Sequence, residues 1–185
     1  MKMKRVLKKV AVVAIALVTM SVAANAQEKG DMAAGGNLVL GSGDSFTNFG
    51  IGAKFQYNVT SPIRLEGSFT YFLPKKQGIS GLAETSVSMW DLSANAHYLF
   101  SVADKITVYP LAGLGFLGTS ASAEVDLGEY GSYGGSASTS EFGFNIGGGI
   151  DYGLTDKLIL NAELKYKLGS TWDRLLISAG LAYKF

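Results

Sequence analysis

The sequence contains no cysteine, only three prolines and a single histidine among its 185 residues. Without cysteine the chain can form neither a disulfide nor a thiolate metal site, so packing and backbone hydrogen bonds must hold the fold together. Beyond residue 26 it also lacks a sustained helical period and any apolar run of the ~20 residues that a membrane-spanning helix needs. These absences argue against a disulfide-stabilised exported domain and against a helical membrane protein.

Residues 1–26 have the layout of a secretory signal. Five basic residues lie within the first nine positions, an eleven-residue uncharged apolar run follows, and Ala24 and Ala26 precede Gln27. We predict cleavage before Gln27, because the apolar run is too short for a membrane anchor and the small residues suit a signal peptidase. The remaining residues carry eleven basic and fifteen acidic side chains, a net charge of −4, which gives no indication of nucleic-acid binding.

Alternating apolar and polar residues fill the rest of the chain. Clusters of turn-forming residues, including many of the 24 glycines, divide the alternation into segments of about ten residues, as expected of antiparallel strands. Eight strands are predicted, over residues 34–42, 48–58, 63–73, 88–100, 106–118, 140–152, 158–167 and 175–185. The fifth of them is apolar on both faces, so its phase stays open.

The predicted connections alternate in length. Residues 59–62, 101–105 and 153–157 form short turns, whereas 74–87 and 119–139 form long loops rich in glycine and serine. An even number of strands, with short turns at one end and longer loops at the other, is typical of an outer-membrane barrel with periplasmic termini. The first part of the second long loop keeps a two-residue period, so the fifth strand is a candidate to project beyond the membrane.

The apolar face of the strands is predicted to face lipid. An eleven-residue strand tilted by ~45° covers about 25 Å, which matches the lipid-facing band of such barrels. Aromatic residues fall at the strand ends and predict two interfacial girdles. The outer girdle comprises Phe49, Tyr71, Trp90, Phe116, Phe142 and Tyr166, and the periplasmic girdle comprises Tyr57, Tyr98, Phe100, Tyr152, Tyr183 and Phe185.

The polar face is predicted to fill the interior of the barrel. Glycines at positions 143, 147, 149 and 180 lie on that face, where they would make room for large neighbours. Five basic and five acidic residues share the face and balance one another, as a dry interior requires. They are Lys54, Arg64, Lys165, Lys167, Lys184, Glu66, Asp91, Glu141, Asp151 and Glu163.

No motif in the sequence predicts catalysis, a cofactor or a metal. Residues 113–118 match the dinucleotide-binding spacing G-x-G-x-x-G but open no helix. Residues 58–60 match a glycosylation acceptor, but begin a short turn. His97 and Ser93 lie on one face of a strand but roughly 13 Å apart, too far to act together. We therefore expect His97 to be a hydrogen-bonding residue of the lumen and the protein not to be an enzyme.

The end of the chain and residues 141–167 resemble a known family. The last strand alternates apolar residues up to a terminal aromatic, and "EFGFNIGGGIDYGLTDKLILNAELKYK" has the same character. In these features the chain resembles the small outer membrane protein beta-barrel domain family, the OmpA/OmpX-like eight-stranded barrels. The resemblance implies that Leu181, Tyr183 and Phe185 form the C-terminal signature that the barrel-assembly machinery reads. It implies no cell-wall anchoring, because the chain lacks the additional domain of the full OmpA pattern.

We therefore predict an all-β, eight-stranded, antiparallel up-and-down transmembrane β-barrel over residues 27–185 in the outer membrane of a Gram-negative bacterium. Its partners would be outer-membrane lipid, the assembly machinery during biogenesis and an unidentified extracellular ligand of the outward loops. It would be a monomer with a structural or surface-interaction role. Three alternatives remain: a narrow non-specific pore, a soluble exported lipocalin-like carrier and a lipid-modifying barrel enzyme.

Overall fold

The computed structural model describes residues 29–43, 47–79, 83–126, 132–169 and 173–185. The predicted signal segment and its cleavage site lie outside these residues. The strands are β1 (Met32–Ser42), β2 (Thr47–Thr60), β3 (Ile63–Ile79), β4 (Ala83–Tyr98), β5 (Phe100–Ala103), β6 (Ile106–Asp126), β7 (Ser132–Gly153), β8 (Leu158–Gly169) and β9 (Arg174–Lys184). Within the described part of the chain, no helix is long and apolar enough to cross a membrane.

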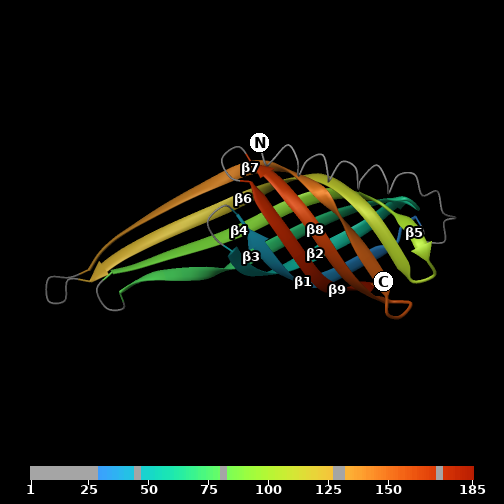
Figure 1. The fold of residues 1–185 in the computed structure, drawn as a ribbon, viewed down its shortest axis with the longest axis horizontal. Helices are drawn as coiled ribbons and strands as arrows, with labels where there is room; N and C mark the ends of the chain where they lie inside the picture. The colour runs from blue at the N-terminus through green and yellow to red at the C-terminus, as the bar shows by residue number, and fades with distance from the viewer. Residues whose placement is uncertain (1–28, 44–46, 80–82, 127–131, 170–172) are drawn as a thin grey trace.

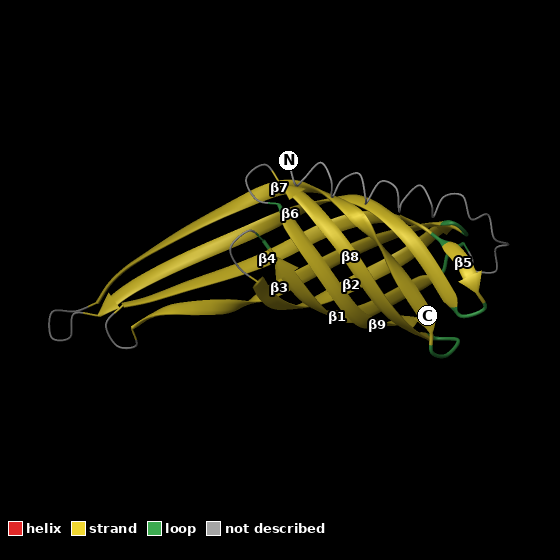
Figure 2. Cartoon of the chain, in the orientation of Figure 1, coloured by secondary structure: helices red, strands yellow, loops and turns green. Residues whose placement is uncertain are grey.

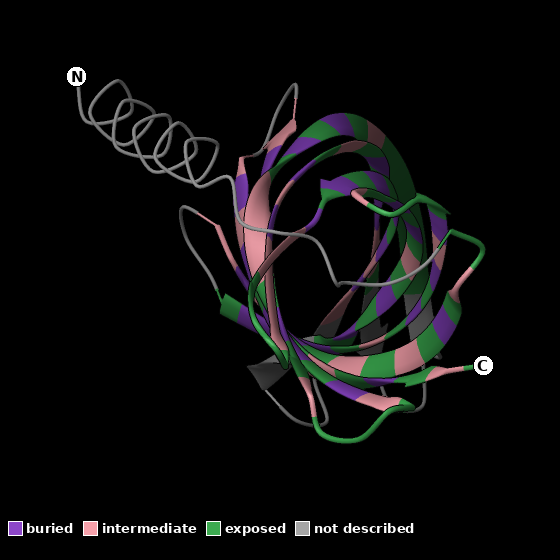
Figure 3. Ribbon diagram, turned by 90° about the vertical axis from the view of Figure 1, so that its right-hand side faces the viewer, coloured by how far each residue is buried: buried purple, intermediate pink, exposed green. Residues whose placement is uncertain are grey.

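The strands form one closed antiparallel barrel, which confirms the predicted fold class. Each strand pairs with its neighbour in the chain, and β1 closes the ring by pairing with β9. Both β4 and the short β5 pair with β6, so these two elements form a single barrel strand interrupted at Leu99. The barrel therefore has eight strands, and a view along it shows the closed ring (Figure 3).

The two faces of the barrel wall differ as the alternation predicts. On β9, Ile177 and Leu181 are exposed on the outside of the isolated chain, whereas Leu176 and Ala182 are buried inside. Buried and exposed residues follow one another along the ribbon in the same way (Figure 3). The outward residues include Leu38, which is 68% exposed. Because so many large apolar side chains would be unfavourable in water, this face suits lipid.

The phase of β6 is now defined. Leu114 and Phe116 point outward and are about half exposed, whereas Tyr109, Leu111 and Leu117 are buried inside the barrel. The sequence left this phase open because the strand places large apolar side chains on both faces. The inward set fills space in the lumen.

Two predicted loops are wrong, because most of their residues belong to strands. Residues 74–87 were expected to form a loop, but Lys75↔Val87 to Ile79↔Ala83 continue the pairing of β3 with β4. Residues 119–139 likewise extend the pairing of β6 with β7 to Asp126↔Ser132. The expectation failed because glycine, serine and charged residues break the alternation of hydrophobicity in 74–87 and in 132–139. The first part of residues 119–139 had suggested that the fifth strand projects beyond the membrane, and the pairing of β6 with β7 agrees with that suggestion.

Four strands thus extend well beyond the other four. The pairing of β2 with β3 ends at Gly50↔Phe72, and the pairing of β7 with β8 begins only at Gly143↔Gly169. The outer parts of β3, β4, β6 and β7 continue without β2 or β8 beside them (Figures 1 and 2). We call these outer parts, residues 73–79, 83–88, 118–126 and 132–142, the protruding sheet.

Candidate functional site

Two regions of the barrel are candidates for function: the lumen and the protruding sheet. The lumen is filled in layers that can be followed along β4, because every second residue of a strand faces the same side. The five inward residues, in order from the outer end, are Met89, Asp91, Ser93, Asn95 and His97. All five are buried.

The outermost layer of the lumen is apolar. Val39, Phe72, Met89 and Leu176 form a buried cluster there. Arg174 lies over the Phe72 ring, with its guanidinium carbon 4.3 Å from the ring centre. Its Nη1 also lies 3.5 Å from the Met89 sulfur. This layer lies at the end of the lumen next to the protruding sheet.

The next layer is built around Asp91. Its carboxylate forms an ion pair with Lys167 on β8 and accepts a hydrogen bond of 2.6 Å from Ser93 Oγ. Lys167 Nζ also donates to Ser93 Oγ at 3.4 Å. The Asp91 and Lys167 charges are therefore compensated inside the barrel, as buried charges must be.

The central layer surrounds Glu66. Its Oε2 lies 3.6 Å from Lys54 Nζ and accepts a hydrogen bond of 2.8 Å from Gln56. Lys54 in turn donates to Asn161 at 2.7 Å, and Lys165 lies 3.9 Å from Glu163. A cavity beside this layer is lined by both lysines and both glutamates, together with serine and threonine hydroxyls. The centre of the lumen is polar, but its charges are paired.

The innermost layer is organised by Arg64. Its Nη1 donates to Asp151 at 2.6 Å, and its guanidinium carbon lies 4.7 Å from the centre of the Tyr109 ring. The His97 ring stacks on Tyr109 with a centroid distance of 4.5 Å. Tyr109 also packs with Leu99 and Leu111 in a second apolar cluster. This layer fills the periplasmic half of the lumen.

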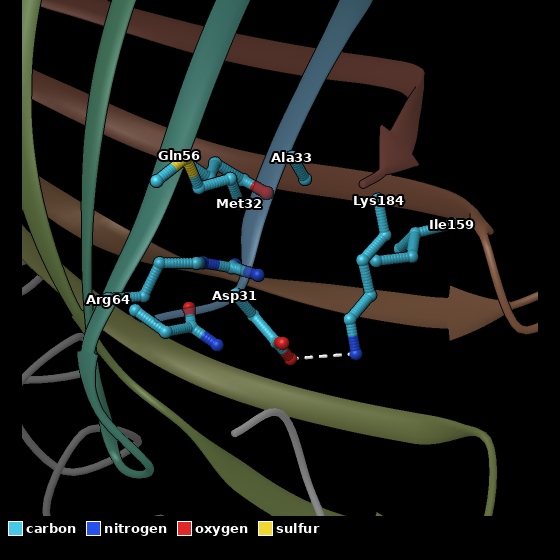
Figure 4. Close-up of a pocket in the computed structure, with 8 residues that line it drawn as sticks. Asp31, Met32, Ala33, Gln56, Arg64, Ile159 and Lys184 are labelled. Carbon is cyan, nitrogen blue, oxygen red and sulfur yellow. Dashed lines mark ion pairs between the residues drawn. The ribbon is translucent and has the colours of Figure 1, made fainter. Parts of the chain in front are cut away.

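At the mouth of the barrel beyond Arg64, the start of β1 is joined to the end of β9. Asp31, just before β1, forms an ion pair of 2.7 Å with Lys184 at the end of β9 (Figure 4). The Phe185 amide also donates to the Met32 carbonyl at 3.1 Å. These contacts secure the seam where the first and last strands meet.

Glu66, His97 and Glu163 resemble a metal site by proximity alone. Their ligand atoms all lie within 4.8 Å of one another. However, Arg64 Nε and Nη2 lie 3.2 and 3.1 Å from His97 Nδ1. Arginine can only donate, so Nδ1 must accept and the proton of the neutral ring lies on Nε2. A metal on Nε2 would need the opposite tautomer, with Nδ1 donating, so these residues do not fit a metal.

His97 and Ser93 do not form a catalytic pair in the structure. Ser93 donates to Asp91, whereas His97 accepts from Arg64 two layers further in. Each side chain thus has its own partner in the lumen. Ser93 and His97 therefore lack the direct contact that an activated nucleophile requires.

The predicted charged residues fall into two groups. Those buried in the lumen are Lys54, Arg64, Glu66, Asp91, Asp151, Glu163, Lys165 and Lys167. Glu141 and Lys184 are half-buried, at the outer and periplasmic ends respectively. The C-terminal residues Leu181, Tyr183 and Phe185 lie exposed on the outer face, where the Phe185 ring is 6.4 Å from that of Phe55.

Three contributors to the lumen were missed in the sequence. Arg174 was missed because it lies just before the predicted last strand, and Asp31 because it precedes the first. Tyr109 was missed because the phase of its strand was open. Strand alternation continued by one residue past Leu175 would have assigned Arg174 to the inward face.

Glycines on the inner face leave space for these large residues. A Cβ atom on Gly149 would lie 2.5 Å from the Tyr109 ring, and one on Gly41 would lie 2.6 Å from Arg174 Nη2. At Gly147 and Gly180 the near atoms are instead backbone atoms of the adjoining strands. Only some of the lumenal glycines therefore make room for large side chains.

The protruding sheet has a different character. Residues 134–140 of β7 are all exposed and are only glycine, serine, alanine or threonine. They pair with β6 from Glu124↔Gly134 to Gly118↔Ser140. Among the described residues, no strand pairs with this part of β7 on its other side. The sheet thus presents open backbone outside the barrel.

Comparisons with known proteins agree with this architecture. The family model described as outer membrane protein beta-barrel domain matches residues 10–185. The chain belongs to this family. Comparison of the sequence with curated proteins found no match.

Solved structures share the fold at low sequence identity. Ail, the attachment invasion locus protein of Yersinia pestis, is 17% identical with a TM-score of 0.58, over 85% of this chain and 99% of Ail. Neisserial surface protein A is 21% identical with a TM-score of 0.58, over 84% and 96% of the two chains. The N-terminal barrel of Pseudomonas aeruginosa OprF is 16% identical with a TM-score of 0.53, over 86% and 100%. The protein is therefore an outer-membrane barrel, and its exposed apolar band faces lipid.

Proposed function

We propose that this barrel is a closed, non-enzymatic monomer of a Gram-negative outer membrane that displays the protruding sheet for surface interaction. In this proposal, residues 1–26 direct export and are removed before Gln27. The assembly machinery then recognises Leu181, Tyr183 and Phe185. The lumenal residues serve stability, and the protruding sheet contacts partners outside the cell.

The observation that carries the proposal is the unequal length of the strands. The pairing of β6 with β7 continues from Phe116↔Phe142 to Asp126↔Ser132. Ten residues of extended strand span about 33 Å at ~3.3 Å per residue. Such a length exceeds what is needed to complete a membrane-spanning barrel, and an ordered sheet displayed by a rigid scaffold is suited to recognition.

The charge of the longest hairpin bears on what it would recognise. One structure of Ail contains the heparin analogue sucrose octasulfate, a polyanion. In the present chain, residues 106–156 contain no lysine and no arginine. This hairpin therefore favours a neutral or cationic partner over a sulfated one.

Cysteine labelling tests the display of the sheet, because the native chain has no cysteine. Ser138→Cys places a thiol on the protruding sheet, and Asp156→Cys places one in the turn at the opposite end of the barrel. On intact cells, a membrane-impermeant maleimide should label the thiol at position 138 but not the one at position 156. Labelling of position 156 alone would show that the sheet faces the periplasm and would refute the proposal.

A shortened hairpin tests the interaction itself. Ser120 and Ser138 face each other on adjoining strands, so an Asn-Gly turn can join them in place of residues 121–137. Expressing cells should lose adhesion to at least one surface in a panel of immobilised basic proteins, acidic proteins and polysaccharides. Heat-modifiable gel mobility should show that the shortened barrel still folds. Equal adhesion of both cell types to every surface would contradict an interaction role.

The pore alternative rests on the polar centre of the lumen. The apolar cluster around Phe72 and the layer around Arg64 lie on either side of that centre. We expect no steady conductance from the folded protein in planar bilayers. Steady openings that change on Arg64 or Glu66 substitution would favour a pore instead.

A further inference from the structure

The protruding sheet has two open edges, and they differ in how they are protected. One edge is the outer part of β3, beyond its last pairing with β2, and the other is the outer part of β7, before its first pairing with β8. An open edge exposes unpaired backbone groups and can add a further strand. Proteins usually protect such edges with proline, lysine or a bulge.

The β3 edge carries all three protections. Pro74 removes a backbone donor at the start of the edge, and Lys75 and Lys76 follow directly. The pairing with β4 also shifts register between Phe72 and Lys75. Strand addition is therefore disfavoured on this side of the sheet.

The β7 edge carries none of these protections. Residues 132–140 contain no proline and no charged residue, and residues 134–140 are exposed. Their pairing with β6 is in continuous register, without a bulge. The side chains of residues 134–140 are small, so a further strand can approach the backbone there without steric conflict. One edge of the sheet is thus blocked and the other is open.

Charge indicates what kind of segment suits the open edge. Glu124 and Asp126 stand on β6, beside β7 in the sheet. No basic residue accompanies them on either strand. A segment that bears lysine or arginine would complement this hairpin, whereas an acidic segment would be repelled.

We propose that the outer edge of β7, residues 132–141, binds an extended protein segment with lysine or arginine side chains as an added β-strand. The inference rests on the proposed display of the sheet outside the cell. Backbone hydrogen bonds from β7 supply most of the affinity, and the acidic residues of the hairpin select against acidic segments.

Peptide binding to the purified full barrel in nanodiscs tests the inference. The probe is a fluorescent ten-residue peptide that alternates lysine with valine and threonine, and binding is followed by anisotropy. A twin with N-methyl groups on two adjacent central residues loses backbone donors on both edges but keeps every side chain. Its affinity should fall by at least about fivefold, since the one ladder bond lost toward β7 contributes ~1 kcal/mol. A second twin with glutamate in place of lysine should bind more weakly still.

Two matched variants of the barrel separate strand addition from simple charge attraction. Ser138→Lys puts a lysine on the open edge, whereas Ser120→Lys puts one directly opposite on the interior strand β6. We expect Ser138→Lys to weaken binding of the lysine peptide about fivefold and Ser120→Lys to weaken it less than about twofold. Equal weakening by both variants, or equal affinity of the N-methylated twin, would overturn strand addition.

Failure of this inference can be distinguished from failure of the proposed function. If intact cells that carry the Ser138→Cys variant are labelled and adhesion depends on the hairpin, but the lysine peptide does not bind, then display stands and this inference is wrong. If position 138 is not labelled on intact cells, the proposed function itself fails. Self-association of the barrel through β7, detected as dimers in place of peptide binding, would also refute the inference.

Discussion

The lumen and the protruding sheet are made from the same strands, yet they use the strand in opposite ways. Inside the barrel, β7 carries Asn145 and Asp151 in ordered polar contacts, with glycines that accept the bulk of neighbouring side chains. Outside it, residues 134–140 of the same strand are small and uncharged and lie along an open edge. The inner part of β7 forms contacts within the barrel, and the outer part leaves backbone groups available for hydrogen bonds to another strand. Stability and interaction can therefore be separated by mutation along one strand.

The largest effect is expected at the centre of the innermost layer. Arg64→Met removes the partner of Asp151 and leaves a buried carboxylate uncompensated. We expect the free energy of unfolding to fall by about 3–5 kcal/mol. Urea unfolding of barrels refolded into lipid vesicles measures it.

The double variant Arg64→Met with Asp151→Leu is the matched control for that change. Because an apolar pair of similar volume replaces the ion pair, most of the lost stability should return. If the double variant is as unstable as Arg64→Met alone, then packing against Tyr109, and not charge, dominates the layer.

A charge on the lipid-facing side ranks second. Leu164 lies midway along β8 and is about half exposed on the outer surface. Leu164→Arg should destabilise the barrel by about 2–4 kcal/mol, as expected for arginine near the bilayer midplane. The same unfolding assay applies, and the same substitution in detergent micelles should cost less. A neutral result in vesicles would mean that this face does not contact acyl chains.

A third, smaller effect concerns the space beside Tyr109. A Cβ atom on Gly149 would meet both the Tyr109 ring and the Ala162 carbonyl oxygen, so Gly149→Ala should cost about 1–3 kcal/mol. Gly67→Ala is the control, because a Cβ atom there meets no atom within 4 Å. If the two alanines cost the same, crowding against Tyr109 would not be the cause.

Much of the barrel could be predicted from sequence because a membrane imposes a strong contrast between its two faces. On β9, for example, most apolar residues alternate with small or polar ones. This pattern predicts both the strand and which of its side chains face lipid. The lumen was less predictable. That Lys167 pairs with Asp91, and Arg64 with Asp151, depends on how strands distant in the sequence face one another across the barrel. The protruding sheet gave the weakest signal, since residues 134–140 of β7 are all exposed and show no alternation.

The smallest effect is expected where the strand has left the membrane, and it sharpens the contrast between the two regions. Ser138→Arg introduces the same side chain as Leu164→Arg, but at an exposed position on the open edge of β7. It should change the free energy of unfolding by no more than about 0.5 kcal/mol, because an exposed side chain loses neither packing nor solvation. It should nonetheless weaken binding of the lysine peptide, since it adds like charge to the edge. A large loss of stability with Ser138→Arg would mean that the protruding sheet stabilises the barrel. The open edge of β7 would then have a structural role as well as a role in interaction.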